Sequence, residues 1–255
     1  VQFSYFSANP NKITMILITV ATSIGGVGIP LLTENYVKGD FRAAGKLVQD
    51  NLTMLVAFLL PATIGAVAIA EPLYTVFYGK PDSLALGLFI LAMLQTVILG
   101  LYTVLSPMIQ ALFQNRKAIL YFGYGVLVKL ILQVPFIYVF KAYGPILSTT
   151  IGLMIPIVLM YKEIHQVTHF NRKTVFKRSL LTAILTLIML LVVLIAGFIL
   201  GLVIKPNGRV TSMIYVALIG GVGIVVYGGL GLRLRFLDRF IGSKAASLRN
   251  KFHIS

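Results

Sequence analysis

The chain has 255 residues, of which 58% are hydrophobic and only 11% are Asp, Glu, Lys or Arg. Soluble domains carry about 25% charged residues, so this composition excludes soluble enzyme folds and predicts an integral membrane protein, as does the mean hydropathy of +0.94. A net charge of +15 would suggest nucleic acid in a soluble protein. Here the basic residues lie between apolar blocks and point to membrane orientation, so no nucleic-acid partner is expected. The lack of Cys excludes disulfides and thiolate metal sites.

Seven apolar blocks along the chain are each about long enough to cross a bilayer. A hydrocarbon core of about 30 Å requires about 20 residues of helix. Backbone amides in lipid need internal partners, and the blocks lack the alternation of β-barrel strands, so they are predicted to be helices. The expected fold is an all-α polytopic membrane helix bundle with transmembrane helices at residues 13–32, 52–70, 84–105, 118–140, 145–161, 179–204 and 211–232.

Two further segments have amphipathic patterns. Residues 34–50 place apolar side chains at spacings of three and four, typical of one helical stripe: Val37, Phe41, Ala44 and Val48. The tail at 233–255 repeats the pattern among many basic residues, with Phe236, Phe240, Leu248 and Phe252. We expect an in-plane helix at 34–50 and a basic cytoplasmic tail. Both would either pack on the membrane surface and orient the protein or recognise anionic membrane lipids.

The basic residues are divided unequally between the two sides of the membrane. Sixteen of the 22 Lys and Arg residues follow the first, third, fifth and seventh blocks, whereas five lie on the other side and Lys129 lies within a block. The positive-inside rule then places the C-terminus in the cytoplasm and residue 1 outside. The chain starts with Val1 and has no cleavable signal pattern before the first block. We therefore expect an upstream segment to be missing, with an uncleaved seven-span protein as the alternative.

Prolines, glycines and the spacing of the blocks carry a family resemblance. The stretches concerned are Pro30-Leu31-Leu32, Gly39-Asp40, Leu60-Pro61-Ala62-Thr63-Ile64-Gly65, Glu71-Pro72-Leu73, Phe77-Tyr78-Gly79, Ser106-Pro107-Met108-Ile109-Gln110-Ala111 and Tyr143-Gly144-Pro145-Ile146-Leu147-Ser148-Thr149-Thr150-Ile151-Gly152. Over nearly the whole chain, the pattern resembles one repeat of the multidrug/oligosaccharidyl-lipid/polysaccharide flippase superfamily. It is most similar to the polysaccharide-biosynthesis branch, which includes MurJ-type lipid II flippases and sporulation stage V protein B-like proteins.

This resemblance implies a fold, a function and a location. Family members have twelve to fourteen spans in two lobes, so the chain would be most of the second lobe, and the missing N-terminal lobe would be its partner. The implied function is movement of a lipid-linked oligosaccharide diphosphate, such as a lipid II-like peptidoglycan precursor, across the bacterial cytoplasmic membrane by alternating access. It implies a transporter, not an enzyme. The alternatives are a multidrug or cation antiporter of the same superfamily and a membrane-embedded transferase acting on lipid-diphosphate sugars. The lack of mid-span carboxylates disfavours the antiporter, and the scattered acids disfavour the transferase.

Three polar residues inside the blocks are candidates to line a substrate cavity. Lys129 lies at the centre of block 118–140, where a charge costs about 2.5–3.5 kcal/mol on insertion scales. Gln133 follows one helical turn later, and Gln95 lies at the middle of block 84–105. An ammonium in a polar cavity could meet the diphosphate of the substrate. Alternatively, Lys129 pairs with a carboxylate or with backbone carbonyls of another span.

Four prolines lie within or at the ends of predicted spans: Pro61, Pro107, Pro135 and Pro156. Proline removes a backbone donor and bends a helix, so each could serve a gate. Proline is also common in membrane helices, and ordinary packing is the alternative.

His165 and His169 are spaced like metal ligands on a helix, but they lie in a basic segment that disfavours a cation, and the Glu of a zincin motif is lacking. No Gly-rich nucleotide loop is present. We expect no metal, no cofactor and no catalytic residue.

Overall fold

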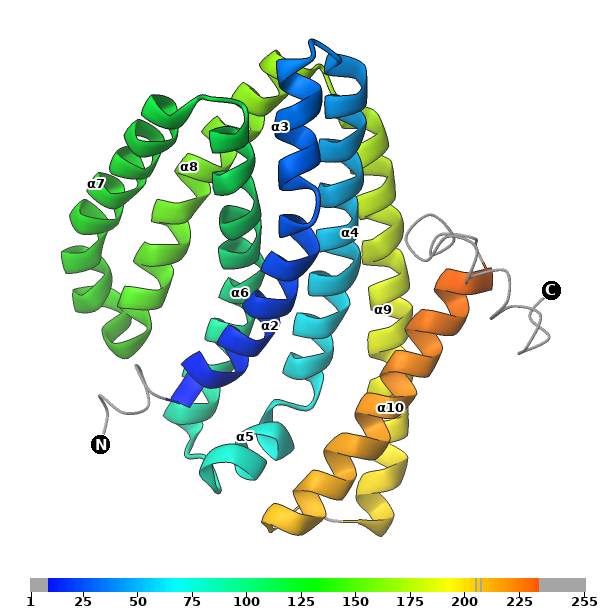
Figure 1. Cartoon of the computed structure of the whole chain (residues 1–255). Coiled ribbons are helices and arrows are strands. Elements are labelled where there is room, and N and C mark those ends of the chain that lie inside the picture. The colour runs from blue at the N-terminus through cyan, green and yellow to red at the C-terminus, as the bar shows by residue number, and fades with distance from the viewer. Residues whose placement is uncertain (1–8, 205, 207, 234–255) are drawn as a thin grey trace. The chain divides into compact units, whose positions relative to one another are not determined.

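The computed structural model describes residues 9–204, 206 and 208–233, and every regular element in these ranges is a helix (Figure 1). The predicted all-α fold is confirmed. The helices are α2 (Asn9–Gly26), α3 (Ile29–Val37), α4 (Phe41–Ala68), α5 (Ala70–Tyr78), α6 (Ser83–Ala111), α7 (Asn115–Phe140), the short 3₁₀ helix η1 (Lys141–Tyr143), α8 (Gly144–Thr168), α9 (Arg172–Val203) and α10 (Arg209–Arg233).

The seven predicted apolar blocks all fall in helices. The described residues contain six helical stretches long and apolar enough to cross a membrane. One of them, Asn115–Thr168, contains both α7 and α8, because η1 joins these helices without a break. The first block is shared by α2 and α3, which are separated by a short turn before Pro30.

The structure differs from the expected in-plane helix at residues 34–50. Gly39 has a φ of +75°, and the carboxylate of Asp40 accepts a 2.9 Å hydrogen bond from the Ala43 amide, so α3 ends and α4 begins within this segment. Ala44 and Val48 of the amphipathic stripe are fully buried in a core of the protein. Residues 41–50 are thus the first turns of a helix that continues to Ala68. The predicted tail helix lies beyond Arg233, outside the described residues.

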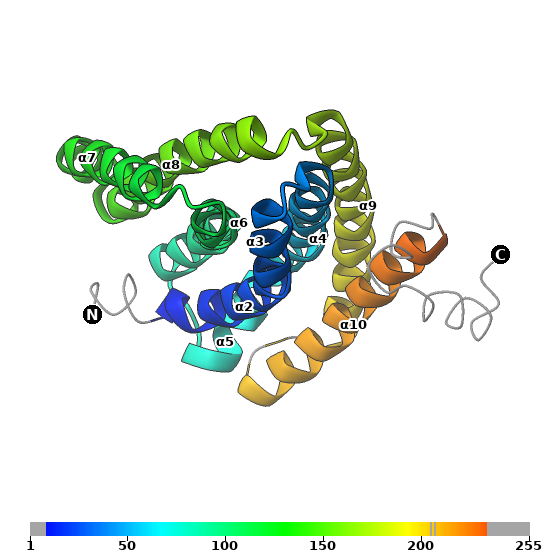
Figure 2. The ribbon, with the colours of Figure 1, turned by 45° about the horizontal axis from the view of Figure 1, so that its top comes forward.

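Unit 1 of the chain comprises residues 1–59 and 83–179. Its core joins α3, α4, α6 and α8, with fully buried side chains that include Leu32, Leu55, Met108 and Met160. The helix α6 contacts α2, α3 and α8, whereas α7 packs mainly on α8 (Figure 2). The α7–α8 hairpin is therefore attached to the rest of the unit chiefly through α8.

Unit 2 comprises residues 60–82 and 180–255. The backbone of Ile69, with φ −114° and ψ 30°, separates the end of α4 from α5. Ile69 packs with Met189 and Val193 of α9 and with Ile219 of α10. The Tyr215 hydroxyl donates a 2.9 Å hydrogen bond to the Gly197 carbonyl and ties α10 to α9.

Candidate functional site

Lys129 lies at a close contact between α7 and α8. A Cβ placed on Gly152 of α8 would lie 2.8 Å from the Lys129 Cβ, and one placed on Gly125 would lie 2.7 Å from the Gly152 carbonyl oxygen. Such distances are shorter than real Cβ contacts, so only glycine fits at both positions. The Lys129 side chain is half-buried, and no residue that the structure describes forms an ion pair or a hydrogen bond with its ammonium. The alternative of an intramolecular carboxylate partner thus finds no support in this part of the chain.

Gln133 and Gln95 occupy different surroundings. Gln133 is half-buried one turn after Lys129, consistent with the expected shared face. The Gln95 amide instead donates to the Ile146 carbonyl at 3.0 Å and to the Thr150 hydroxyl at 3.1 Å, both in α8. These bonds join α6 to α8 within unit 1. The arrangement favours a structural role for Gln95, while the role of Lys129 and Gln133 in a cavity stays a prediction.

The four prolines lie inside helices that continue past them. Pro156 is buried, and its Cδ would lie 2.8 Å from a Cβ on Gly125, so it packs at the α7–α8 contact. Pro61 is also buried, Pro107 is half-buried and Pro135 is exposed. Packing accounts for Pro156, and the gating roles of all four remain predictions.

The turns α3–α4, α6–α7 and α8–α9 lie at the same end of unit 1 (Figure 1). There the Lys117 ammonium lies 2.6 Å from a carboxylate oxygen of Glu163, and the Tyr121 hydroxyl donates to the other oxygen at 3.1 Å. A second ion pair joins Arg178 of α9 to Asp50 of α4 at 2.8 Å. These contacts hold α7 to α8 and α4 to α9 at this end of the unit. Both pairs link residues far apart in the sequence.

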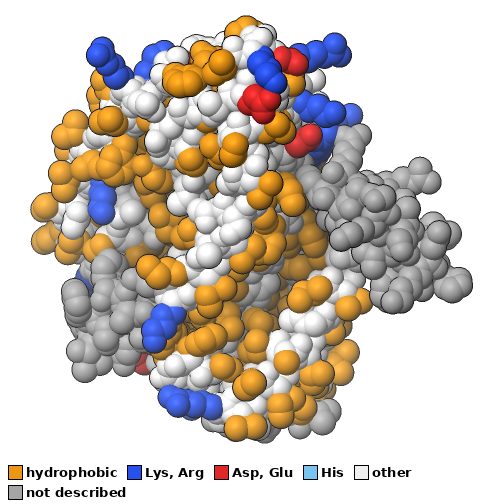
Figure 3. All heavy atoms as spheres, viewed as in Figure 1, with side chains coloured by type: hydrophobic (Ala, Val, Ile, Leu, Met, Phe, Trp, Pro, Cys, Tyr) orange, Lys and Arg blue, Asp and Glu red, His pale blue; other side chains and the backbone are white. Residues whose placement is uncertain are grey.

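This end of unit 1 remains strongly positive. Its acids are engaged: Glu34 pairs with Lys38, and Asp40 caps α4. Figure 3 shows Lys and Arg side chains gathered there beside a few acids. In the part of the chain that the structure describes, seven exposed basic residues at this end form no ion pair: Arg42, Lys46, Arg116, Lys162, Arg172, Lys173 and Lys177.

The two histidines contribute to packing near the same end. His165 packs edge-on against Phe170 with ring centroids 5.1 Å apart, while the His165 and His169 rings are 6.5 Å apart. His169 has a φ of +50° and its amide donates to the His165 carbonyl, which ends α8.

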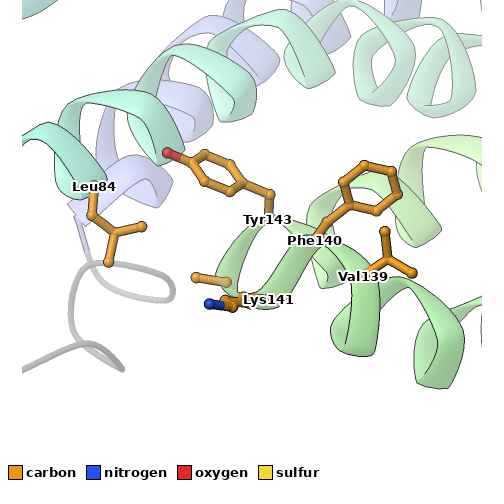
Figure 4. A pocket seen from close by; sticks show the side chains of 6 residues that line it. Leu84, Val139, Phe140, Lys141 and Tyr143 are labelled. Atoms are coloured by element: carbon orange, nitrogen blue, oxygen red, sulfur yellow. The ribbon is translucent and has the colours of Figure 1, made fainter.

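At the opposite end of the α7–α8 hairpin, an open cavity of about 270 Å³ is lined mainly by apolar side chains (Figure 4). The sequence analysis missed it, because only the turn at η1 brings Leu84 of α6 close to the end of α7. Lys141 is the one charged residue that lines this cavity, and its φ is +50°. Tyr143 packs over Gly87, where a side chain would meet its hydroxyl. In the sequence, the signal that could have pointed to this cavity was Lys141, which lies between two apolar blocks.

The helices and their apolar faces define a multi-pass membrane protein. No family model matches the chain. The chain is 30% identical over 238 residues to the lipid II flippase MurJ of Bacillus subtilis (strain 168), a match covering 91% of this chain and 44% of that protein. A solved structure, the lipid II flippase MurJ in an inward closed conformation, matches with a TM-score of 0.67 at 20% identity and covers 94% of this chain and 47% of that one.

The chain is therefore a homologue of the MurJ-type flippases, and the resemblance seen in its sequence is confirmed. It spans about half the length of these relatives.

Proposed function

We propose that this chain forms one lobe of a flippase that moves a lipid II-like, lipid-linked precursor across the cytoplasmic membrane. The observation that carries the proposal is the 30% identity over 91% of the chain to a protein named a lipid II flippase. The chain spans about half of that relative, so a second lobe would complete the central site. The two lobes would move about this site and expose it to each side in turn.

The proposed orientation places the positive end of unit 1 in the cytoplasm. Basic residues concentrate in loops on that side of multi-pass proteins. Seven exposed basic residues at this end, none of them in an ion pair with any described residue, support this choice. The division of basic residues along the sequence, 16 on one side against five on the other, supports the same orientation, in which residue 255 would lie in the cytoplasm and residue 1 outside.

Lys129 is the residue that we propose to contact the diphosphate of the substrate. A charged group at the middle of an apolar helix is costly unless it faces water or a partner. No partner is found among the described residues, and a diphosphate supplies the opposite charge in the functional state. Gln133, one turn away, would donate a hydrogen bond to the same group. Neighbouring Gly152 gives the Lys129 stem room against α8.

The antiporter and the transferase receive less support. Within the described chain, five acids lie near helix ends or in turns, and Asp50 lies in the third turn of α4; the five are Glu34, Asp40, Glu71, Asp82 and Glu163. Several are already engaged in ion pairs or in capping. A cation antiporter or a metal-dependent transferase would need free carboxylates close together at a site.

Translocation of fluorescent lipid II in vesicles tests the proposal. The vesicles would contain this chain alone, or this chain together with the part of the Bacillus relative outside the matched region. We expect translocation only when both parts are present, because one lobe cannot enclose a site between two lobes. Translocation by the chain alone would contradict the two-lobe account. If the combined parts neither move nor bind lipid II, the flippase proposal is contradicted.

A further inference from the structure

The turn that ends α6 places a bulky aromatic residue where glycine is usual. The Gln114 amide donates to the Ile109 carbonyl at 3.2 Å and the Phe113 amide donates to the Gln110 carbonyl at 2.9 Å. This pair of hydrogen bonds is the Schellman motif, and Phe113 occupies its left-handed position with a φ of +58°. Left-handed backbone is unfavourable for a bulky side chain. A glycine would close the turn with less strain, so the ring itself needs an explanation.

The Phe113 ring joins two other aromatic rings at the positive end of unit 1. Tyr36 lies between them, with its ring centroid 6.0 Å from that of Phe113 and 5.8 Å from that of Phe41. The three residues come from the turn after α6, the end of α3 and the start of α4. Tyr36 is partly buried against the core, but Phe113 is 62% exposed and Phe41 47% exposed. We call these three residues the aromatic cluster.

Basic residues flank the aromatic cluster in the sequence. Arg42 follows Phe41 directly, and Arg116 lies in the first turn of α7, three residues after Phe113. Both arginines are exposed, and neither forms an ion pair with any residue in the described ranges. The nearby Lys38 is neutralised by Glu34. The surroundings of the cluster are therefore apolar at the rings and positive at the rim.

The height of the cluster along the helices indicates what covers it. It lies at the ends of α3, α4 and α6, which belong to stretches long and apolar enough to cross a membrane. We infer from this that the cluster lies at the level of the lipid headgroups, where aromatic rings are favoured and basic residues attract anionic lipids. A water-soluble partner would have to displace these lipids from exposed rings.

We propose that the aromatic cluster is an interfacial anchor that binds phospholipids with anionic headgroups. The rings of Phe41 and Phe113 lie at the boundary between headgroups and acyl chains, and Arg42 and Arg116 contact the lipid phosphates. Phe113 is kept in a strained turn because its ring is needed there. The anchor is independent of which substrate the protein moves.

The absence of Trp from the chain allows a direct test. Phe113→Trp introduces a single indole ring at the cluster without changing the backbone requirement. The 255-residue chain would be placed in two sets of zwitterionic vesicles. One set contains a small fraction of a brominated anionic lipid, and the other contains the same fraction of a brominated zwitterionic lipid. We expect quenching of the indole fluorescence to be strongest when bromine lies near the glycerol, and an apparent affinity about fivefold higher for the anionic lipid.

Three further variants keep the test decisive. Phe41→Trp reports the same site from an ordinary helical position, in case the substitution at residue 113 disturbs folding. Ile131→Trp, at a 71% exposed position in the middle of α7, is the depth control and should be quenched best by bromine deep in the acyl chains. Adding Arg42→Gln and Arg116→Gln to the Phe113→Trp variant should abolish the anionic preference.

Two results would overturn the proposal. One is equal quenching of the Phe113→Trp and Phe41→Trp variants by the anionic and the zwitterionic brominated lipids. The other is unquenched fluorescence with a water-exposed spectrum in both variants, which would point to a protein-docking surface.

Discussion

The helices α6 and α7 are equally plausible membrane spans by sequence, but the structure uses them differently. Twelve residues of α6 are buried, including Leu88, Met93 and Met108, whereas only Ala118 and Gly125 are buried in α7. The helix α6 packs on α2, α3 and α8 and also contacts α7, while α7 packs mainly on α8. Apolar side chains cover most of the surface of α7.

In a membrane, the hydropathy of a helix does not show how much of it packs against other helices. Lipid tails are as apolar as Leu, so an apolar residue can face either lipid or protein at little difference in transfer free energy. What distinguishes the two helices is the fit of small and large side chains. The contact of α7 depends on glycines at its crossing with α8, and that of α6 depends on large side chains in a core.

Met108→Ala should give the largest loss of stability. Met108 is fully buried in the core of unit 1, so the truncation leaves a cavity. We expect a loss of about 2–4 kcal/mol in the free energy of unfolding, because packing is lost even where the transfer contribution is small. Thermal unfolding in nanodiscs measures it. Ile131→Ala in α7 is the control and should change stability by less than about 0.5 kcal/mol. Similar losses for both would erase the distinction between the helices.

Gly125→Ala should weaken the α7–α8 contact. The added Cβ would lie 2.7 Å from the Gly152 carbonyl oxygen and 2.8 Å from the Pro156 Cδ, so the helices must separate. Overpacking of this kind costs about 1–3 kcal/mol. Gly123→Ala, in the same helix with nothing within 4 Å, is the matched control and should be neutral or slightly stabilising. The same unfolding measurement decides it, and equal effects at the two positions would refute the close crossing.

Gln95→Leu should have a smaller effect. It removes the two hydrogen bonds from α6 to Ile146 and Thr150 of α8. Hydrogen bonds between membrane helices average about 0.6 kcal/mol and reach about 1.7 kcal/mol. We therefore expect a loss of about 1 kcal/mol in stability, with substrate movement retained. Loss of movement at unchanged stability would instead return Gln95 to the substrate cavity.

The spans could be predicted from the sequence because each apolar block is by itself about long enough to cross a bilayer. The single helix expected over residues 34–50 is divided at Gly39 between α3 and α4. A stripe of apolar residues does not reveal whether protein or lipid covers it, and Ala44 and Val48 are core residues. The partners of Gln95 lie 51 and 55 residues away in the sequence, so only the fold reveals them.

Other features differed in how visible they were in the sequence. The left-handed turn at Phe113 could not be predicted from the sequence, because glycine usually occupies this position of the motif. Lys129 could be found at once, because a charge inside an apolar block stands out.

The most direct test of the account is Lys129→Met in the lipid II translocation assay, with thermal stability measured in parallel. Lys129→Arg keeps the charge, and Lys80→Met removes an exposed lysine between α5 and α6 as the matched control. We expect Lys129→Met to abolish most movement at unchanged or higher stability, because the insertion cost of the charge disappears. Lys129→Arg should retain part of the movement, and Lys80→Met all of it. A stable Lys129→Met protein that moves lipid II at the full rate would contradict the proposed contact between this ammonium and the substrate diphosphate.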